Sequence, residues 1–293
     1  MTTMQGKTCL VTGATSGVGK AAAQALADEG ATVVIVGRDA VKTARVVDEI
    51  KATTGNNAIS SLLADLSIQA DIHRLATEFQ DTHDRLDVLI NNAGGIFLER
   101  QLSADGIEMT FALNHLNYFL LTNLLLDMLK ASAPARVINV ASDAHRFGPL
   151  DFDDLQSERS YSAFGVYGRS KLANILFTVE LARRLAGSGV TANALHPGFV
   201  NSGFGKNNRD GFWRGLFVKL YDWIGPLIAR SPEKAAETVV YLATSPDVAD
   251  VTGQYFVDCK PKTLDAAATD RATAARLWEV SAELVDLPTA VSP

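Results

Sequence analysis

Short apolar runs alternate with amphipathic stretches along most of the chain. Short runs typical of buried strands occur at 7–12, 31–38, 57–66, 86–94, 135–142, 190–198 and 254–259, and the run at 31–38 is continuously apolar. Helical spacing of apolar positions occurs up to Gly30, at 41–55, 71–83, 106–131, around Tyr167, at 231–246 and at 264–287. This alternation predicts an α/β fold, with a doubly wound parallel sheet of about seven strands and helices on both faces.

Composition restricts the class of protein. The 293 residues contain no repeat and no linker-like shift in composition, so we expect a single domain over 1–293. A net charge of −6 without any basic stripe argues against a nucleic-acid partner. Cys9 and Cys259 lie in apolar runs and have neither disulfide nor metal spacing, which fits a reduced cytoplasmic compartment.

We expect no integral membrane segment. The amino-terminal MTTMQGKTCLVTG lacks the apolar core and cleavage site of a secretory signal. The longest apolar stretches are interrupted by Asn123 and Asp127, and by Lys219 and Asp222, before they could span a bilayer.

A glycine-rich turn follows the first predicted strand. Gly13, Gly17 and Gly19 form the pattern TGxxxGxG, and such glycines let the backbone approach a pyrophosphate at the helix amino terminus. The spacing differs from GxGxxG, and a merely tight strand-to-helix turn is the alternative. Because the turn opens an alternating chain, we favour a nucleotide site and a Rossmann-type domain.

The end of the second predicted strand reads Val36-Gly37-Arg38-Asp39. A carboxylate at this end binds the adenosine ribose of NAD, whereas a basic side chain accommodates the 2′-phosphate of NADP. Glycine stands where the carboxylate is expected and Arg38 follows, so we expect NADP(H) rather than NAD(H). Lys42 either assists or is simply solvated.

Tyr167 and Lys171 are four residues apart in a predicted helix and share one face of it. A nearby ammonium favours the phenolate and so lowers a tyrosine pKa from its usual value of about 10. The alternative is a packed tyrosine beside a solvated lysine.

Further motifs give the chain a resemblance to a known family. TGATSGVG, Asp65, NNAG at 91–94, Asn114, Ser142, Tyr167 with Lys171, and Pro197-Gly198 stand in the order found in short-chain dehydrogenases/reductases. The runs YGRSKLANILFTVELARRL and QYFVDCKP resemble the retinol dehydrogenase branch. The chain departs from this branch in two ways. It lacks the amino-terminal membrane segment common in vertebrate members, and Asn117 replaces a usual glycine. We expect the change at Asn117 to leave the chemistry unchanged.

The resemblance implies catalytic roles. Tyr167 would be the proton donor or acceptor, and Lys171 would hold the nicotinamide ribose and lower the tyrosine pKa. Ser142 would hydrogen-bond the substrate oxygen, and Asn114 would hold a water that connects Lys171 to solvent. Asn114 and Ser142 as ordinary caps are the alternative.

The resemblance also implies cofactor contacts. Asp65 and Leu66 would lie at the adenine, and Pro197, Gly198, Val200 and Ser202 near the nicotinamide. The remaining expected contacts are Gly13, Thr15, Ser16, Gly17, Val18, Gly19, Arg38, Asn92, Ala93, Gly94, Tyr167 and Lys171.

Three histidines invite other interpretations. His115 and His145 have no metal-ligand spacing, and we expect no metal site and no imidazole mechanism. His196, before Pro197, is interpreted as a packed residue at a strand end.

The segment 201–232 carries glycines followed by Phe212, Trp213, Phe217, Tyr221 and Trp223. Residues 5–200 would form the dinucleotide-binding core with the catalytic residues. The segment 201–232 follows this core, and its aromatic residues predict a lid over an apolar pocket. Packing in a core or interface is the alternative for these aromatics, and the few basic residues disfavour a membrane-surface role.

We therefore expect an NADP(H)-dependent oxidoreductase. Its small-molecule substrate would be a hydrophobic ketone, aldehyde or alcohol, including retinoid- or steroid-like compounds. A catalytically silent nucleotide-binding regulator or scaffold with the same fold is the alternative. Resemblance further suggests a homodimer or homotetramer.

Overall fold

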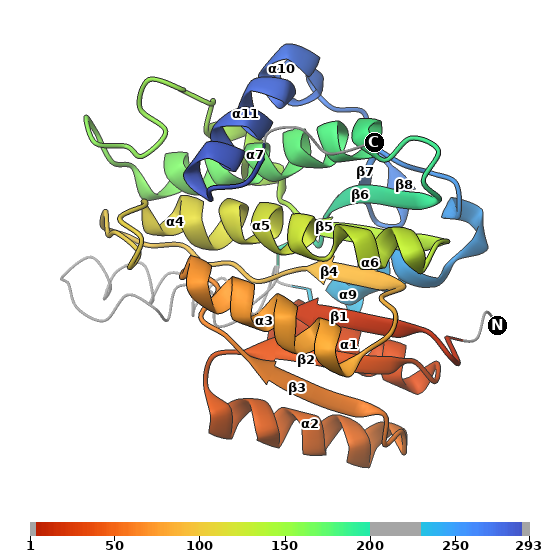
Figure 1. The fold of residues 1–293 in the computed structure, drawn as a ribbon. Coiled ribbons are helices and arrows are strands. Elements are labelled where there is room, and N and C mark those ends of the chain that lie inside the picture. Colours follow the sequence, from red (N-terminus) through yellow and green to blue (C-terminus); the bar gives the residue numbers. More distant parts are fainter. Residues whose placement is uncertain (1–3, 200–229, 289–293) are drawn as a thin grey trace.

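The computed structural model describes residues 4–199 and 230–288. These residues form one sheet in the order β3-β2-β1-β4-β5-β6-β7-β8, with helices on both faces (Figure 1). All neighbouring strands are parallel except β7 and β8, which are antiparallel. The strands are β1 (Thr8–Thr12), β2 (Thr32–Gly37), β3 (Ile59–Leu63), β4 (Val88–Asn91), β5 (Ala135–Val140), β6 (Val190–His196), β7 (Tyr255–Val257) and β8 (Lys260–Pro261).

The central strands are buried on both faces, as their continuous apolar runs predict. Successive residues alternate between two cores: Leu10 and Val34 face one apolar cluster, whereas Cys9 and Val33 face the other. This pattern, with its parallel pairing, confirms the predicted doubly wound sheet.

The helices divide between the two cores. One face carries α1 (Gly17–Asp28), α2 (Ala40–Thr54) and α9 (Pro232–Thr244). The other carries α3 (Gln69–Thr82), α4 (Met109–Phe111), the π-helix η1 (Ala112–Leu116), α5 (Asn117–Leu124), α6 (Leu126–Ala131) and α7 (Ala163–Arg184). The short 3₁₀ helices are η2 (Asp143–Phe147) and η3 (Pro246–Val248), and α10 (Ala266–Thr269) and α11 (Arg271–Leu284) lie outside α7 (Figure 1).

The eighth strand was not expected. The predicted strand 254–259 ends at Val257, and Asp258 and Cys259 adopt positive φ values of 51° and 59°. Two consecutive residues of this kind form the tight hairpin turn that suits the twist of antiparallel strands. The chain therefore reverses into β8 instead of continuing β7.

Two predicted helices are interrupted. The helix expected over 106–131 begins at Met109 and contains η1, where the Asn117 N–H bonds to the Ala112 carbonyl five residues earlier. The terminal helix expected over 264–287 is divided at Asp270, whose carboxylate caps α11 through the Thr273 N–H at 2.8 Å. Apolar periodicity alone does not show either break.

α11 covers the outer face of α7. Trp278 is 2% exposed and lies with its ring centroid 4.9 Å from Phe119 and 5.8 Å from Phe177. The Arg184 guanidinium stacks over the indole at 4.2 Å. These contacts join the carboxyl-terminal helix to the core that carries Tyr167.

Among the described residues, no helix combines the length and apolarity needed to cross a membrane. The lid predicted over 201–232 lies outside the described residues, apart from Arg230, Ser231 and Pro232.

Candidate active site

The glycine turn after β1 packs closely against the end of β4. Gly13 has a φ of +64°, and a Cβ on it would lie 2.7 Å from the Ala93 Cα. Gly17 opens α1 with a φ of +56°, and the Ser16 side chain does not cap the helix. The first-turn amides, including that of Val18, therefore lie at a helix amino terminus without a capping side chain.

Side-chain hydrogen bonds lock this turn to β4. Thr12 Oγ1 accepts from the N–H groups of Asn92 and Ala93, at 2.9 and 3.1 Å. Asn92 Nδ2 donates to the carbonyls of Thr12 and Gly13, at 2.9 and 3.2 Å. A Cβ on Gly19 would come within 2.4 Å of that Nδ2. The structure thus joins the TGxxxGxG and NNAG motifs, with the Asn92 amide as the link.

The end of β2 excludes a side chain at the position of the expected carboxylate. A Cβ on Gly37 would lie 2.2 Å from Thr43 Oγ1 and 2.6 Å from Thr15 Cγ2. Arg38 is exposed beyond it. The Asp39 carboxylate caps α2 by accepting from the N–H of its third residue at 2.8 Å.

At the end of β3, Asp65 and Leu66 face different surroundings. Asp65 Oδ1 accepts from Ser67 Oγ at 2.7 Å and from the Ser67 N–H at 3.0 Å. Leu66 is 5% exposed and belongs to the apolar core. Any contact of Leu66 with a ligand would therefore come mainly from its backbone.

Tyr167 and Lys171 lie on one face of α7, as predicted. Lys171 is 3% exposed, and its Nζ donates to the Val140 carbonyl at 2.9 Å. The same Nζ lies 5.7 Å from the Tyr167 ring centroid and 5.6 Å from that of Tyr118. Burial lowers the pKa of Lys171 to about 7. The alternative of a solvated lysine is wrong.

Ser142 begins η2 directly after β5. Its Oγ accepts from the Ala144 N–H at 3.2 Å, so the capping role is present. That contact uses a lone pair and leaves the hydroxyl proton to donate elsewhere. The Ser142 carbonyl accepts from His145 Nδ1 at 2.8 Å, which makes Nδ1 the protonated nitrogen of this imidazole.

Asn114 lies in the π-helix and holds the loop after β4. Its Oδ1 accepts from the Gly95 N–H at 2.8 Å, and its Nδ2 donates to the Gly95 carbonyl at 2.9 Å and to Ser170 Oγ at 3.0 Å. A Cβ on Gly94 would lie 3.0 Å from Asn114 Oδ1 and 3.6 Å from Lys171 Nζ. Asn114 is thus beside Lys171 and caps no helix.

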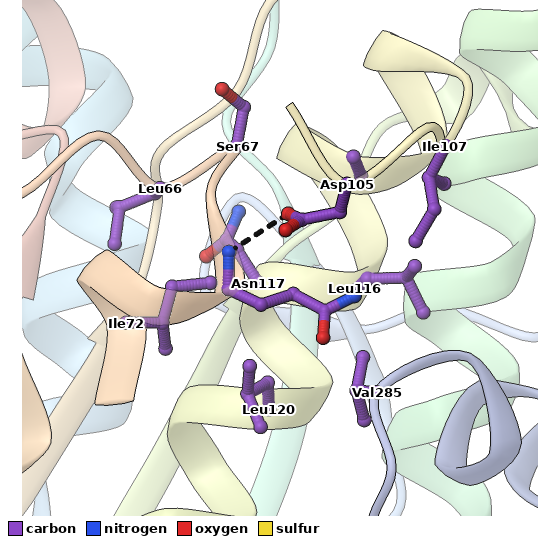
Figure 2. Close-up of a pocket in the computed structure, with 11 residues that line it drawn as sticks. Leu66, Ser67, Ile72, Asp105, Ile107, Leu116, Asn117, Leu120 and Val285 are labelled. Atoms are coloured by element: carbon purple, nitrogen blue, oxygen red, sulfur yellow. Dashed lines mark hydrogen bonds between the residues drawn. The ribbon is translucent and has the colours of Figure 1, made fainter. Parts of the chain in front are cut away.

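The Asn117 side chain replaces a backbone hydrogen bond that the π-helix lacks. The Asn117 backbone N–H donates to the Ala112 carbonyl, five residues earlier, and its Nδ2 donates to the Leu113 carbonyl, four residues earlier. Asn117 Oδ1 is buried and finds no partner among the described residues. It lines a cavity of about 10 Å³ beside Leu66, room for roughly one water. Figure 2 shows the residues that line this cavity. The Asp105 carboxylate accepts from the Gln69 N–H at 2.9 Å.

The histidines occupy separate sites. His115 is completely buried, with Nε2 2.9 Å from Ser281 Oγ on α11, and burial lowers its pKa to about 4. His145 is 4% exposed against Tyr255. Burial also lowers the pKa of His196 at the end of β6, as expected for a packed residue.

The loop after β6 contacts Arg230, which forms an ion pair with the turn between β7 and β8. Pro197 and Gly198 are half-buried, and a Cβ on Gly198 would lie 2.6 Å from Arg230 Cδ. The Arg230 guanidinium forms an ion pair with both carboxylate oxygens of Asp258. Val200 and Ser202 lie outside the described residues.

A buried polar ladder beneath the site was not predicted. Asn91 Nδ2 donates to Thr122 Oγ1 at 3.0 Å and to Asn139 Oδ1 at 2.9 Å. Asn139 Nδ2 donates in turn to Thr178 Oγ1 at 2.9 Å. The ladder ties β4 and β5 to α5 and α7. Asparagines inside apolar strands were the available sequence signal, but their partners lie on other elements.

The predicted residues within the described ranges converge on the carboxyl ends of the strands. β1 and β4 are neighbours although β2 and β3 intervene in the chain, which places the site at a topological switch point. Sequence reasoning missed Tyr118, whose hydroxyl donates to the Val140 carbonyl at 3.4 Å. Because Tyr118 lies in an apolar helix, nothing in the sequence around it indicates that it is close to Lys171.

Known proteins are similar to the chain over nearly its whole length. The family model of short chain dehydrogenases matches residues 7–212. Human retinol dehydrogenase 13 is 44% identical over 289 residues, covering 97% of this chain and 86% of the relative.

Two solved structures extend the comparison. An uncharacterized protein from Mycobacterium paratuberculosis is 30% identical with a TM-score of 0.79, covering 99% of this chain and 97% of the other. The Pseudomonas aeruginosa RhlG/NADP active-site complex is 28% identical with a TM-score of 0.69, covering 87% and 95%. The chain belongs to the short-chain dehydrogenase/reductase family of oxidoreductases, in its retinol dehydrogenase branch.

Proposed function

We propose that the protein is an NADP(H)-dependent oxidoreductase that interconverts a hydrophobic carbonyl compound and the corresponding alcohol. The observation that carries this proposal is the buried Lys171 ammonium, held by the Val140 carbonyl and 5.7 Å from the Tyr167 ring. Burial disfavours the charged form of an amine, so a buried lysine beside a phenol is a candidate for a functional pair that transfers a proton.

The residues around the glycine turn fit a dinucleotide. The backbone of Gly13 and Gly17 adopts positive φ, and the α1 amino terminus lacks a capping side chain. Such a terminus attracts a pyrophosphate through free N–H groups and the helix dipole. The proposed contacts are those expected from the sequence, from Gly13 through Ser202, although Val200 and Ser202 lie outside the described residues.

Three observations support NADP(H). Thr15 and Thr43 leave no space for a carboxylate at Gly37, Arg38 is exposed just beyond it, and the Asp39 carboxylate already caps α2. A guanidinium pairs well with a 2′-phosphate, which NAD lacks. RhlG, a structural relative, was solved with NADP.

The chain's own residues would then move the proton. NADP(H), when bound, supplies or accepts the hydride. In reduction the Tyr167 hydroxyl donates its proton to the carbonyl oxygen, while the Ser142 hydroxyl donates a hydrogen bond to the same oxygen. The Lys171 charge favours the resulting phenolate. Among the described residues, Asn114 Oδ1 accepts from the Gly95 N–H alone, which leaves a lone pair for a relay water.

Apolar side chains support a hydrophobic substrate. Phe147 at the end of η2, Phe164 in the first turn of α7 and Phe199 after Gly198 are 73%, 52% and 49% exposed. All three extend from elements that carry proposed site residues. The relative's name assigns retinol to that enzyme, and we propose ketones, aldehydes, retinoids or steroid-like compounds here. The lid over 201–232 and the dimer or tetramer stay predictions.

The test combines nucleotide binding with turnover. NADPH would be titrated by fluorescence, and its consumption followed with a panel of aldehydes and ketones. We expect turnover by the wild type and a loss of at least 100-fold in Tyr167→Phe, since general acid catalysis contributes about 10²–10⁴-fold. Binding of NADPH should persist in the variant. Tight binding without consumption, unchanged by Tyr167→Phe, would instead indicate the silent regulator.

A further inference from the structure

Two glycines bring η2 into direct contact with the α7 backbone. A Cβ on Gly168 would lie 2.6 Å from the Ala144 carbonyl oxygen and 2.9 Å from the Gly148 nitrogen. A Cβ on Gly148 would lie 2.1 Å from the Gly165 carbonyl oxygen and 2.2 Å from the Arg169 nitrogen. At Gly168 and at Gly148, backbone atoms of the other element occupy the position that a Cβ would take. The backbones of η2 and α7 are therefore in direct contact, without an intervening side chain.

These contacts join the two elements that hold the proposed catalytic groups. Gly168 directly follows Tyr167, and Ala144 is two residues after Ser142 in the short helix that Ser142 caps. The Ser142 backbone is further held through its carbonyl by His145 Nδ1 at 2.8 Å. The whole η2 segment therefore sits as a unit on the turn of α7 that carries Tyr167.

We propose that Gly168 is a positioning residue for the reaction, because it lets η2 rest on the α7 backbone and so sets Ser142 against Tyr167. This inference rests on the proposed function of those two residues. A methyl group at 168 requires the Ala144 carbonyl to move by several tenths of an ångström, since a Cβ essentially never lies closer than 3.0 Å to such an atom. The movement would displace Ser142 relative to Tyr167, although both hydroxyl groups must reach the same substrate oxygen.

The same helix supplies a matched control. Gly165, one turn earlier in α7, is less crowded: among the described residues, an added Cβ would meet Ser162 atoms alone, at 3.5 Å. Replacing either glycine by alanine removes the same backbone freedom and raises helix propensity equally. Only the substitution at 168 meets the η2 backbone.

The test compares Gly168→Ala with Gly165→Ala in kcat, in KM for the carbonyl substrate and in NADPH affinity. We expect kcat to fall by about 10- to 100-fold in Gly168→Ala, the scale of a small misalignment of reacting groups. NADPH affinity should stay within about twofold of the wild type, and Gly165→Ala should match the wild type throughout. Thermal unfolding of each variant shows whether the protein is folded in the assay.

A double-mutant cycle separates positioning from a general structural defect. In a Ser142→Ala background, Gly168→Ala should reduce kcat less than about twofold further, because the group it positions is already absent. An equal reduction in both backgrounds, or a kcat in Gly168→Ala equal to that of Gly165→Ala, would overturn the inference. If Tyr167→Phe also retained full turnover, the proposed function itself would fail, and that result is distinguishable from the first two.

Discussion

Lys171 is buried, and within the part of the chain that the structure describes its Nζ hydrogen-bonds to the Val140 carbonyl alone, at 2.9 Å. Its 3% exposure removes most of the hydration that an ammonium has in the unfolded chain. Burial accordingly lowers its pKa from 10.5 to about 7. At the scale of single residues, the proposed catalytic lysine thus opposes folding, as is common where a site requires a buried charge.

Lys171→Met should stabilise the nucleotide-free protein at pH 7 by roughly 2–4 kcal/mol while abolishing turnover. The unfolded chain binds the lysine proton up to pH 10.5, but the folded protein releases it above about 7. Wild-type stability should therefore rise from pH 7 towards 10.5, and the difference from the variant should shrink. Urea unfolding at pH 7 and pH 9 measures both values.

The control for this prediction is Lys260→Met, at an exposed position in β8. Its stability should follow that of the wild type at both pH values. A Lys171→Met protein that is less stable than the wild type at pH 7 would contradict the account of a strained buried amine.

Arg38→Ala should lower the preference for NADPH over NADH by tenfold or more, the usual scale for losing a charged hydrogen bond. The effect should fall on NADPH alone, because NADH has no 2′-phosphate to pair with the guanidinium. Steady-state KM values for both nucleotides give the ratio. Arg45→Ala removes another exposed arginine of the same region, one that pairs with Glu49 at 3.4 Å. A ratio unchanged in Arg38→Ala, or equally lowered in Arg45→Ala, would exclude a specific role.

At the scale of elements, η1 and α11 show how the site depends on helices that periodicity does not resolve. The π-helix carries Asn114, and single turns of π-helix within α-helices are frequent at functional sites. Asn117 supplies a side-chain donor for the carbonyl of Leu113 in that turn, so this departure from the family pattern has a structural use. α11 reaches the same segment through Ser281, which contacts His115.

We expect acid to weaken the docking of α11, because the buried His115 contacts Ser281 on that helix. The unfolded chain binds the imidazole proton below pH 6.5, whereas the folded protein binds it only below about 4. Wild-type stability should therefore fall as the pH drops from 6.5 to 4, by up to about 3 kcal/mol from this group. His115→Gln should lose less stability over that interval, as measured by urea unfolding at pH 7 and pH 4.5.

His73→Gln, which changes an exposed histidine of α3, is the control and should keep the wild-type acid dependence. If His115→Gln lost as much stability as the wild type between the two pH values, protonation of His115 would not limit the docking of α11.

At the scale of the whole molecule, the strand order brings distant motifs together. β1 and β4 are paired through Cys9 and Val88, so the glycine turn meets NNAG across a separation of about eighty residues. β5 lies beside β4 and delivers Ser142 to the same edge. α7, which packs against η2, carries Tyr167 and Lys171. Every part of the proposed site thus depends on the same parallel sheet.

The sequence by itself determined the alternation of strands and helices, the glycine turn and the pairing of Tyr167 with Lys171. Periodicity and spacing record these features because they arise from neighbours along the chain. The hairpin at Asp258, the π-helix and the burial of Lys171 were decided only by tertiary structure. Each is held by residues distant in sequence: Arg230 pairs with Asp258, Ser281 contacts His115 of the π-helix, and the Val140 carbonyl accepts from Lys171. Close packing selects among conformations that local patterns leave equivalent.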